Sequence, residues 1–258
     1  ASMHIAGRGR ILIWEGASLW IMEALPEKGA SSHSTDFHSH HAVQVTLSLG
    51  GRFKLRTADH GIAADAAVAP DVSHLFEAEG LNAILFIEPE SRAGRAIIHR
   101  LFDGAVLVPI PSGLATDLVE RLAVTYRNSG TDDAHLMALG RSLVARLADT
   151  VEAELPDARV QQIIAYAAAR LDNPITLGVV ASSVGLSPGR VRHLFVEQTG
   201  LPFRTYLLWL RIMKAVSVFA DGRSLTEAAH EAGFADSAHF SRTFRRMFGL
   251  PAAALRIE

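Results

Sequence analysis

The chain has 258 residues and no cysteine, which excludes disulfide bonds and thiolate metal sites and favours a reducing compartment. The net charge of −2 is unevenly divided, because residues 158–258 carry 12 Lys and Arg against 7 Asp and Glu, while residues 1–157 are acidic. No apolar run of membrane-spanning length and no signal-peptide pattern is found, so the sequence predicts a cytoplasmic protein with no membrane partner. The basic C-terminal part predicts a polyanionic partner, and the length suits two domains.

Residues 10–90 have the pattern of a β domain. The Gly50-Gly51 pair between two of its strands is typical of a two-residue hairpin turn. Short strands with turns at close spacing indicate a sandwich or a small barrel. The candidate strands are Ile11–Trp14, Ser18–Leu25, Ala42–Leu49, Arg52–Thr57, Ala66–Ala69 and Asn82–Glu88.

A polar cluster rich in histidine lies within residues 38–49. Strand alternation places an apolar set on one face and a polar set on the other, and the parity of His41 keeps it out of the polar set. The apolar set is Val43, Val45, Leu47 and Leu49, and the polar set is His38, His40, Gln44, Thr46 and Ser48. The candidate effector-binding residues are His38, His40, Gln44, Thr46 and the more distant His74.

His38-Ser39-His40, Gln44, Pro70 and His74 resemble a degenerate form of the two cupin motifs. The resemblance implies that three imidazoles converge inside a barrel, with Gln44 at the position of a metal-binding glutamate. Three imidazoles and an amide can hold a divalent ion, since His suits Zn, Cu, Fe and Ni. A metal site at His38, His40, Gln44 and His74, a metal-free effector pocket, and a solvent-facing cluster stay open as interpretations. Trp14, Trp20 and Phe86 are candidates either for the pocket lining or for the core.

Helical patterns follow at residues 93–102, 112–128 and 134–152. In the last of these, a leucine stripe has the spacing of a helix–helix seam. The stripe predicts either a dimer contact or packing against the barrel of the same chain, and the pattern does not decide between them. Its members are Leu136, Leu139, Leu143, Leu147 and Val151. A linker with Pro156 inside it is expected at residues 152–159.

Two similar helix-turn-helix patterns occupy the last hundred residues, about 48 positions apart. In the first, Thr176 is expected to cap a helix that ends at Gly185, and Ser187-Pro188 begins the next helix. Val191, Leu194 and Phe195 form the buried stripe of that second helix. Its outward face then carries Gly189, Arg190, Arg192 and His193, and arginine on such a face suits guanine edges in a major groove.

The second pattern repeats this logic. Ser224 and Glu227 predict a capping box, and Asp236 is expected to cap the helix that follows Gly233-Phe234. The residues left for base edges are Ser237, Ala238, His239, Ser241 and Arg242, and Arg245 and Arg246 further along suit phosphate. Between the two patterns, residues 203–219 read as one unbroken helix about 25 Å long that spaces the two readers.

The stretch Gly233–Phe244, followed by Phe248-Gly249, is similar to the signature of the AraC/XylS family of transcription regulators. Positions around Leu186-Ser187, Leu194-Phe195, Thr199-Gly200 and Arg211 to Ala215 match the first unit and linker of that family. The resemblance implies a seven-helix DNA-binding domain with recognition helices at 188–198 and 237–247. Gly189, Arg192 and His193 would read bases in the first, and Ser237, Ala238, His239 and Arg242 in the second. The terminus departs from the family pattern, with Pro251 one place early and Leu255 in place of an aromatic residue.

The predicted fold is therefore an α+β multidomain protein. It has a cupin-like effector-binding β-barrel at residues 3–110, a helical linker and dimerisation region at 111–155, and an all-α double helix-turn-helix domain at 156–258. We expect an effector-controlled, sequence-specific transcription regulator, classed with activators although the sequence does not decide the sign, and not an enzyme. Its expected partners are double-stranded DNA, a small-molecule or metal effector, a second copy of the chain and RNA polymerase. The alternative is a metal-dependent cupin enzyme fused to a DNA-binding domain.

Overall fold

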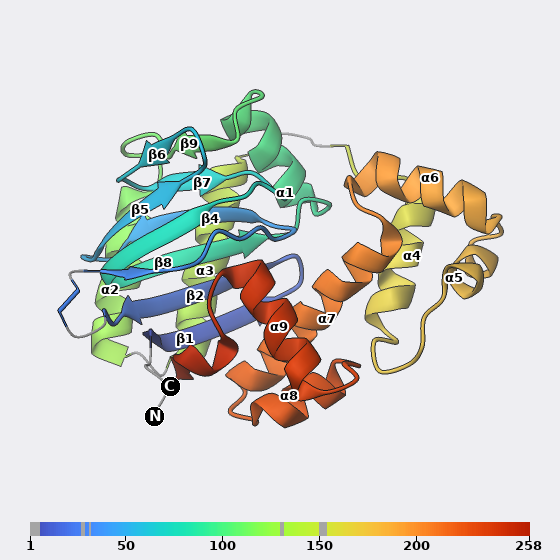
Figure 1. Ribbon diagram of the computed structural model, residues 1–258. Coiled ribbons are helices and arrows are strands. Elements are labelled where there is room, and N and C mark those ends of the chain that lie inside the picture. The colour runs from blue at the N-terminus through green and yellow to red at the C-terminus, as the bar shows by residue number, and fades with distance from the viewer. Residues whose placement is uncertain (1–5, 27–28, 31, 130–131, 150–153) are drawn as a thin grey trace. The chain divides into compact units, whose positions relative to one another are not determined.

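The computed structural model describes residues 6–26, 29–30, 32–129, 132–149 and 154–258 (Figure 1). The chain is a mixed α+β protein with an N-terminal sheet domain and C-terminal helices. Two compact units are distinguished. One consists of the chain up to Ala153 together with Phe244–Glu258, and the other of Glu154–Thr243. Across the described residues, none of the helices combines the length and the apolar character needed to cross a membrane.

The first unit is organised by one long strand, β8 (Leu75–Ile87), which takes part in two sheets. Its second half pairs antiparallel with β2 (Ala17–Ala24) and β4 (Val43–Ser48). Its first half pairs with β5 (Arg52–Arg56) and β3 (His33–Ser34). The remaining strands extend these pairings: β1 (Gly7–Trp14) beside β2, β7 (Ala66–Val68) beside β4, β9 (Leu107–Pro109) beside β7, and β6 (Gly61–Ile62) beside β5.

The predicted hairpin at Gly50-Gly51 is wrong, because β4 and β5 pair with different halves of β8 and not with each other. The backbone N–H groups of Leu49 and Gly51 both donate to the carbonyl of Leu81. A Cβ on Gly51 would lie 2.6 Å from the carbonyl oxygens of Glu79 and Leu81. The glycine is therefore needed for close approach to β8 at the point where the chain passes from one sheet to the other.

One face of the larger sheet is covered by helices α1 (Arg92–Ile97), α2 (Thr116–Ser129) and α3 (Asp133–Ala148), with a π-helical turn η1 (Ile98–Phe102) after α1. The leucines of α3 are buried in one core with Leu19, Ile21, Val45 and Leu47 of the sheet. The stripe left open either a dimer contact or packing within the chain, and the structure shows packing within the chain. The residues that pack in this way are Leu136, Leu139, Leu143 and Leu147. Val151, the last member of the stripe, lies outside the described residues.

The end of the chain belongs to the sheet domain. After α9 (Ser237–Phe248), a short 3-10 turn η2 (Ala252–Ala254) leads into β10 (Leu255–Ile257), which pairs parallel with β1 at the edge of the sheet. The backbone N–H of Ala6 donates to the carbonyl of Ala254, and that of Glu258 donates to Gly9. The residues that depart from the family terminus thus form a turn and an edge strand in place of a last helix.

The second unit is helical. Thr176 and Ser187 cap α5 (Leu177–Ser183) and α6 (Pro188–Thr199) as predicted, and Ser224 with Glu227 forms the predicted capping box of α8 (Leu225–Glu231). Asp236 accepts a bond from the backbone N–H of His239 at 2.6 Å. The expected unbroken helix is α7 (Phe203–Ala220), which contacts both α6 and α8, and α4 (Ala158–Ala168) completes the unit.

Candidate functional site

Two helices of the C-terminal region present polar faces to solvent. On α6 the predicted readers Gly189, Arg190, Arg192 and His193 are all exposed, while Val191, Leu194 and Phe195 are buried beneath them. The corner before α6 is held open by Gly185, whose positive φ of 66° is a conformation that glycine adopts without strain. The segregation of faces leaves the arginines free of the core of the unit.

On α9 the same segregation recurs. Phe240 and Phe244 are buried, whereas Ala238 and Arg242 are exposed and Ser237, His239 and Ser241 are half-buried. Gly233 has the equivalent positive φ of 77° in the corner before this helix. Arg246 is exposed at the C-terminal end of α9. Arg245 is exposed as well, but its guanidinium holds the Asp36 carboxylate, with Nη2 and Oδ2 2.8 Å apart.

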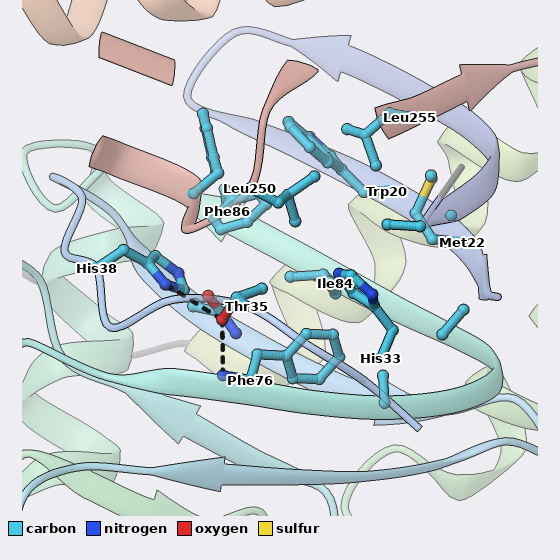
Figure 2. Close-up of a pocket in the computed structure, with 16 residues that line it drawn as sticks. Trp20, Met22, His33, Thr35, His38, Phe76, Ile84, Phe86, Leu250 and Leu255 are labelled. Atoms are coloured by element: carbon cyan, nitrogen blue, oxygen red, sulfur yellow. Dashed lines mark hydrogen bonds between the residues drawn. The ribbon is translucent and has the colours of Figure 1, made fainter. Parts of the chain in front are cut away.

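A buried pocket lies in the sheet domain, with a volume of about 80 Å³ (Figure 2). Trp20 and Phe86, which the sequence offered as pocket or core residues, both line it, whereas Trp14 packs in the helix-covered core. Figure 2 shows Leu250 and Leu255, which follow α9, on the same wall as Trp20 and Phe86. The full lining is Ala6, Gly7, Trp20, Met22, Ala24, His33, Thr35, His38, Gln44, Phe76, Ala78, Ile84, Phe86, Phe248, Leu250 and Leu255.

The three predicted histidines meet at one end of this pocket. His38, His40 and His74 are buried, and each offers a ring nitrogen such that the three atoms lie within 4.8 Å of one another. Oε1 of Gln44 lies 3.0 Å from Nε2 of His40 and 3.1 Å from Nε2 of His74, and Nδ1 of His74 donates to the carbonyl of Val72 at 2.9 Å. The backbones of His38 and His74 also bond to each other across an isolated bridge. The solvent-facing interpretation of the cluster is therefore wrong.

Burial sets the protonation of this cluster. It lowers the pKa of His38 to about 4, with a further lowering from His74 that outweighs the bond to the Asp36 carbonyl. The pKa of His40 lies well below its usual value because the ring is buried and faces the other two histidines. Burial also lowers the pKa of His74. The three rings are neutral near neutral pH, which is the state that binds a metal ion.

Two neighbours of the cluster have other partners. Thr46 is fully buried and accepts a bond from Nε2 of Gln44 at 3.1 Å, but it does not line the pocket. His41 lies outside the cluster, as its parity predicted, with Nδ1 2.8 Å from Asp71 and Nε2 2.6 Å from Glu90. Burial alone would lower the pKa of His41, but the bonds to these two carboxylates raise it to about 9.

Sequence reasoning missed most of the apolar lining. Strand parity could have found part of it, because Met22 and Ala24 share the face of Trp20, and Ile84 is the register partner of both Trp20 and Thr46. The wall made by Phe248, Leu250 and Leu255 had no such signal. These residues had been placed in the core and terminus of the DNA-binding domain, and only the tertiary fold brings them to the sheet.

Parts of this chain are similar to known transcription regulators. Residues 180–257 match the family described as "Helix-turn-helix domain". The transcriptional activator RhaS of Klebsiella pneumoniae (strain 342) is 37% identical over 98 residues, which are 38% of this chain and 35% of that protein. RhaS of Enterobacter sp. (strain 638) is 32% identical over 171 residues, 66% of this chain and 60% of that protein. The matches thus cover less than two thirds of these relatives.

Among solved structures, ToxT of Vibrio cholerae O395 has a TM-score of 0.56 at 12% identity, covering 92% of this chain and 95% of its own. ToxT of Vibrio cholerae strain SCE256, bound to an unsaturated fatty acid, has a TM-score of 0.54 at 12% identity and covers 93% and 95%. At this identity the likeness concerns the fold, an N-terminal sheet domain followed by a helical domain.

The homologues are transcription regulators and not enzymes, in agreement with the prediction that the chain is not an enzyme. The resemblance seen in the Gly233–Phe244 stretch is likewise confirmed. The C-terminal region of this chain, residues 180–257, is a helix-turn-helix domain of the AraC family, and RhaS-type regulators are its homologues.

Proposed function

We propose that this protein is a sequence-specific DNA-binding transcription regulator in which α5–α6 and α8–α9 are two helix-turn-helix units. The observation that carries the proposal is the repeated geometry of the two units. Each has a capped first helix, a glycine with positive φ in the corner and a second helix with exposed arginine opposite a buried apolar stripe. A helix with this division of faces can enter a major groove without disturbing its own core.

Base reading is assigned to the outward side chains of α6 and of the first half of α9. Arg192 and Arg242 are the strongest candidates, because a guanidinium can bond both O6 and N7 of a guanine. The other proposed readers are Gly189, Arg190, His193, Ser237, Ala238, His239 and Ser241. Arg245 and Arg246 at the end of α9 are assigned to phosphate, and double-stranded operator DNA is the partner.

The pocket in the sheet domain is proposed as the effector site of a cupin-like barrel. His38, His40, Gln44, Thr46 and His74 form or support its polar end, and the apolar remainder suits a small organic ligand. The wall formed by Phe248, Leu250 and Leu255 follows directly on α9. A ligand that favours one position of this wall would bias α9, which is the differential affinity that effector control requires.

For the parts of the regulator we propose the barrel at residues 3–110, the helical linker at 111–155 and the DNA-binding domain at 156–258, whose last strand, β10, pairs with β1 of the sheet domain. A homodimer and a contact with RNA polymerase belong to the same proposal. Because the leucine stripe of α3 is buried within the chain, a dimer would use another surface. Sedimentation of the full chain, and transcription in vitro with purified polymerase from a promoter that carries the operator, test these two points and the sign of regulation.

The central experiment selects bound sequences from random DNA with the full chain and then compares variants on the selected operator. Arg192→Ala and Arg242→Ala should each cost about 1–3 kcal/mol of binding and relax the preference at one base. Arg204→Ala, an exposed arginine at the start of α7, is the matched control and should preserve the preference. Unchanged affinity and preference in both reader variants would refute the assignment, and failure to select any sequence would refute the function.

A divalent metal as effector is a second candidate, favoured by the three buried histidines with ligand atoms within 4.8 Å of one another. His38, His40 and His74 would hold the ion, with Gln44 as a further ligand, and neutral imidazoles suit Zn, Cu, Fe or Ni. Elemental analysis of the purified full chain should find about one metal per chain, lost in His74→Ala but kept in His60→Ala, an exposed histidine. Operator binding with no metal in the wild-type chain would favour the metal-free pocket.

A further inference from the structure

We infer that the pocket of the sheet domain takes a small, uncharged and mainly apolar molecule, and that it excludes carboxylates, phosphates and sugars. The inference rests on the proposed function only in treating the pocket as an effector site. Three features of the pocket support it. The lining is mainly apolar, polar atoms of the lining are already hydrogen-bonded within the protein, and the pocket is small.

Within the described part of the wall, the only ionisable side chains are the imidazoles of His33 and His38. Among the described lining residues there is no Lys, Arg, Asp or Glu, and the large side chains are Trp20, Met22, Phe76, Ile84, Phe86, Phe248, Leu250 and Leu255. An anionic group that enters such a space loses its hydration and gains no cation in exchange. This imbalance should weaken the binding of a carboxylate or phosphate by at least about tenfold.

The polar atoms of the wall are already bonded within the protein. Oγ1 of Thr35 accepts from the backbone N–H of Phe76 at 3.0 Å, as Figure 2 shows, and Nδ1 of His38 lies 2.8 Å from the carbonyl of Asp36. Gln44 donates to Thr46, and its Oε1 lies within hydrogen-bond distance of Nε2 of His40 and of His74. A sugar would bury several hydroxyl groups here with few free partners, and each unmet group is costly.

The polar lining consists mainly of His33, Thr35, His38 and Gln44, and part of its hydrogen-bonding capacity is left at the end that carries Gln44. Gln44 Nε2 keeps a second hydrogen beyond the one given to Thr46, and this end of the wall also carries His38. A single hydroxyl or carbonyl on the ligand can be met there while an apolar body rests against Trp20 and Phe86. The cavity of about 80 Å³ limits the ligand to about one ring or a short chain.

Matched probes test the ligand class on the full chain in buffer with a metal chelator. p-Cresol and p-toluate share the methyl-bearing ring and differ in charge, and myo-inositol represents a polyol. Titration calorimetry should show p-cresol binding at least about tenfold more tightly than p-toluate, with no detectable binding of myo-inositol. Because Trp20 lines the pocket, p-cresol should also change the tryptophan fluorescence, and Trp20→Phe should remove that change.

Two variants on one strand locate the binding. Ala24→Phe adds a ring at a half-buried lining position and should weaken p-cresol at least about tenfold. Glu23→Phe adds the same ring one residue earlier, on the opposite face of β2, and should leave the affinity unchanged within about twofold. If Ala24→Phe does not fold, the fluorescence assay with wild type and Trp20→Phe still shows whether p-cresol binds in the pocket.

Three results would overturn the inference: p-toluate or myo-inositol binding as tightly as p-cresol, no probe binding at all, or p-toluate binding that appears once Zn²⁺ replaces the chelator. Operator selection on the same preparation separates these outcomes from the proposed function. If a DNA sequence is selected while the probes fail, the ligand class is wrong and the regulator stands. If p-cresol binds in the pocket and no DNA sequence is selected, the regulator fails and the ligand class stands.

Discussion

The guanidinium of Arg245, near the end of α9, holds the carboxylate of Asp36 in the segment after β3, with 2.8 Å between Nη2 and Oδ2. The backbone joins them as well, since the N–H of Asp36 donates to the carbonyl of Gly249 at 2.7 Å. A Cβ on Gly249 would lie 2.5 Å from the backbone carbonyl oxygen of Asp36. An arginine proposed to bind phosphate is thus occupied by an acidic residue of the sheet domain, and DNA must compete with that residue for it.

Asp36→Asn should therefore strengthen binding to the operator. The released arginine becomes available to phosphate, so affinity should rise by up to about fivefold and the slope of log K against log salt should steepen by up to about one. Salt titrations of DNA binding measure both quantities. Asp59→Asn, an exposed carboxylate in the turn after β5, is the control and should change neither. If Asp36→Asn leaves both values unchanged, Arg245 does not reach phosphate.

Structural features that depend on residues close together in the sequence were predicted better than features that depend on residues far apart. Helices such as α7 and caps such as Ser187 and Ser224 were predicted because periodicity and capping act within a few residues. Each of the six predicted strands overlaps an observed strand, but β8 was predicted only from Asn82, so its first half was missed. Phe76, Glu77, Ala78 and Glu79 do alternate, but glutamate and glycine are uncommon in strands, and Gly80 stands between this half and the apolar second half.

The candidate site divides in the same way. His38, His40, Gln44 and His74 were grouped by strand parity and motif, and the structure brings them together. Leu250 and Leu255 were not grouped with them, because a wall made by the opposite end of the chain leaves no local pattern. The pairing of β10 with β1 joins Leu255 to Gly7, and three residues are too short for strand periodicity to be recognised.

Gly51→Ala should destabilise the sheet domain by about 2 kcal/mol or more. The added Cβ would meet the backbone of Glu79 and Leu81 at 2.6 Å, and a backbone held by sheet bonds cannot easily move away. Gly61→Ala in the same region is the comparison, because its Cβ would meet the flexible end of Lys54 at 3.1 Å. Urea denaturation of both variants measures the difference. Equal stabilities would mean that the crossing at Gly51 relaxes freely.

Leu255→Ala should lower the free energy of unfolding by about 1–2 kcal/mol, because the side chain is half-buried against the pocket. Arg256→Ala on the same strand is exposed and should change it by less than about 0.5 kcal/mol. Chemical denaturation, followed by the fluorescence of the tryptophans, reports both. Should the two variants unfold alike, β10 would contribute no side-chain packing to the sheet domain.

Ionisation of Glu88, which directly follows β8, should lower the stability of the sheet domain as pH rises. Burial raises its pKa to about 7, with a further rise from Glu90 and Glu15 that the nearby His41 opposes. The folded state therefore binds a proton that the unfolded chain, with a carboxyl pKa near 4.5, releases earlier. Stability falls as pH rises from about 4.5 to about 7, and the loss is complete above that range.

Glu88→Gln removes this ionisation while keeping the size of the side chain. The variant should match the wild type at about pH 4 and exceed its stability at about pH 8, by at most about 3 kcal/mol and by less to the extent that water reaches the carboxylate. Denaturant titrations at the two pH values provide the comparison. A gain for Glu88→Gln at the acid pH, or none at the alkaline pH, would show that this carboxyl ionises in the folded protein without penalty.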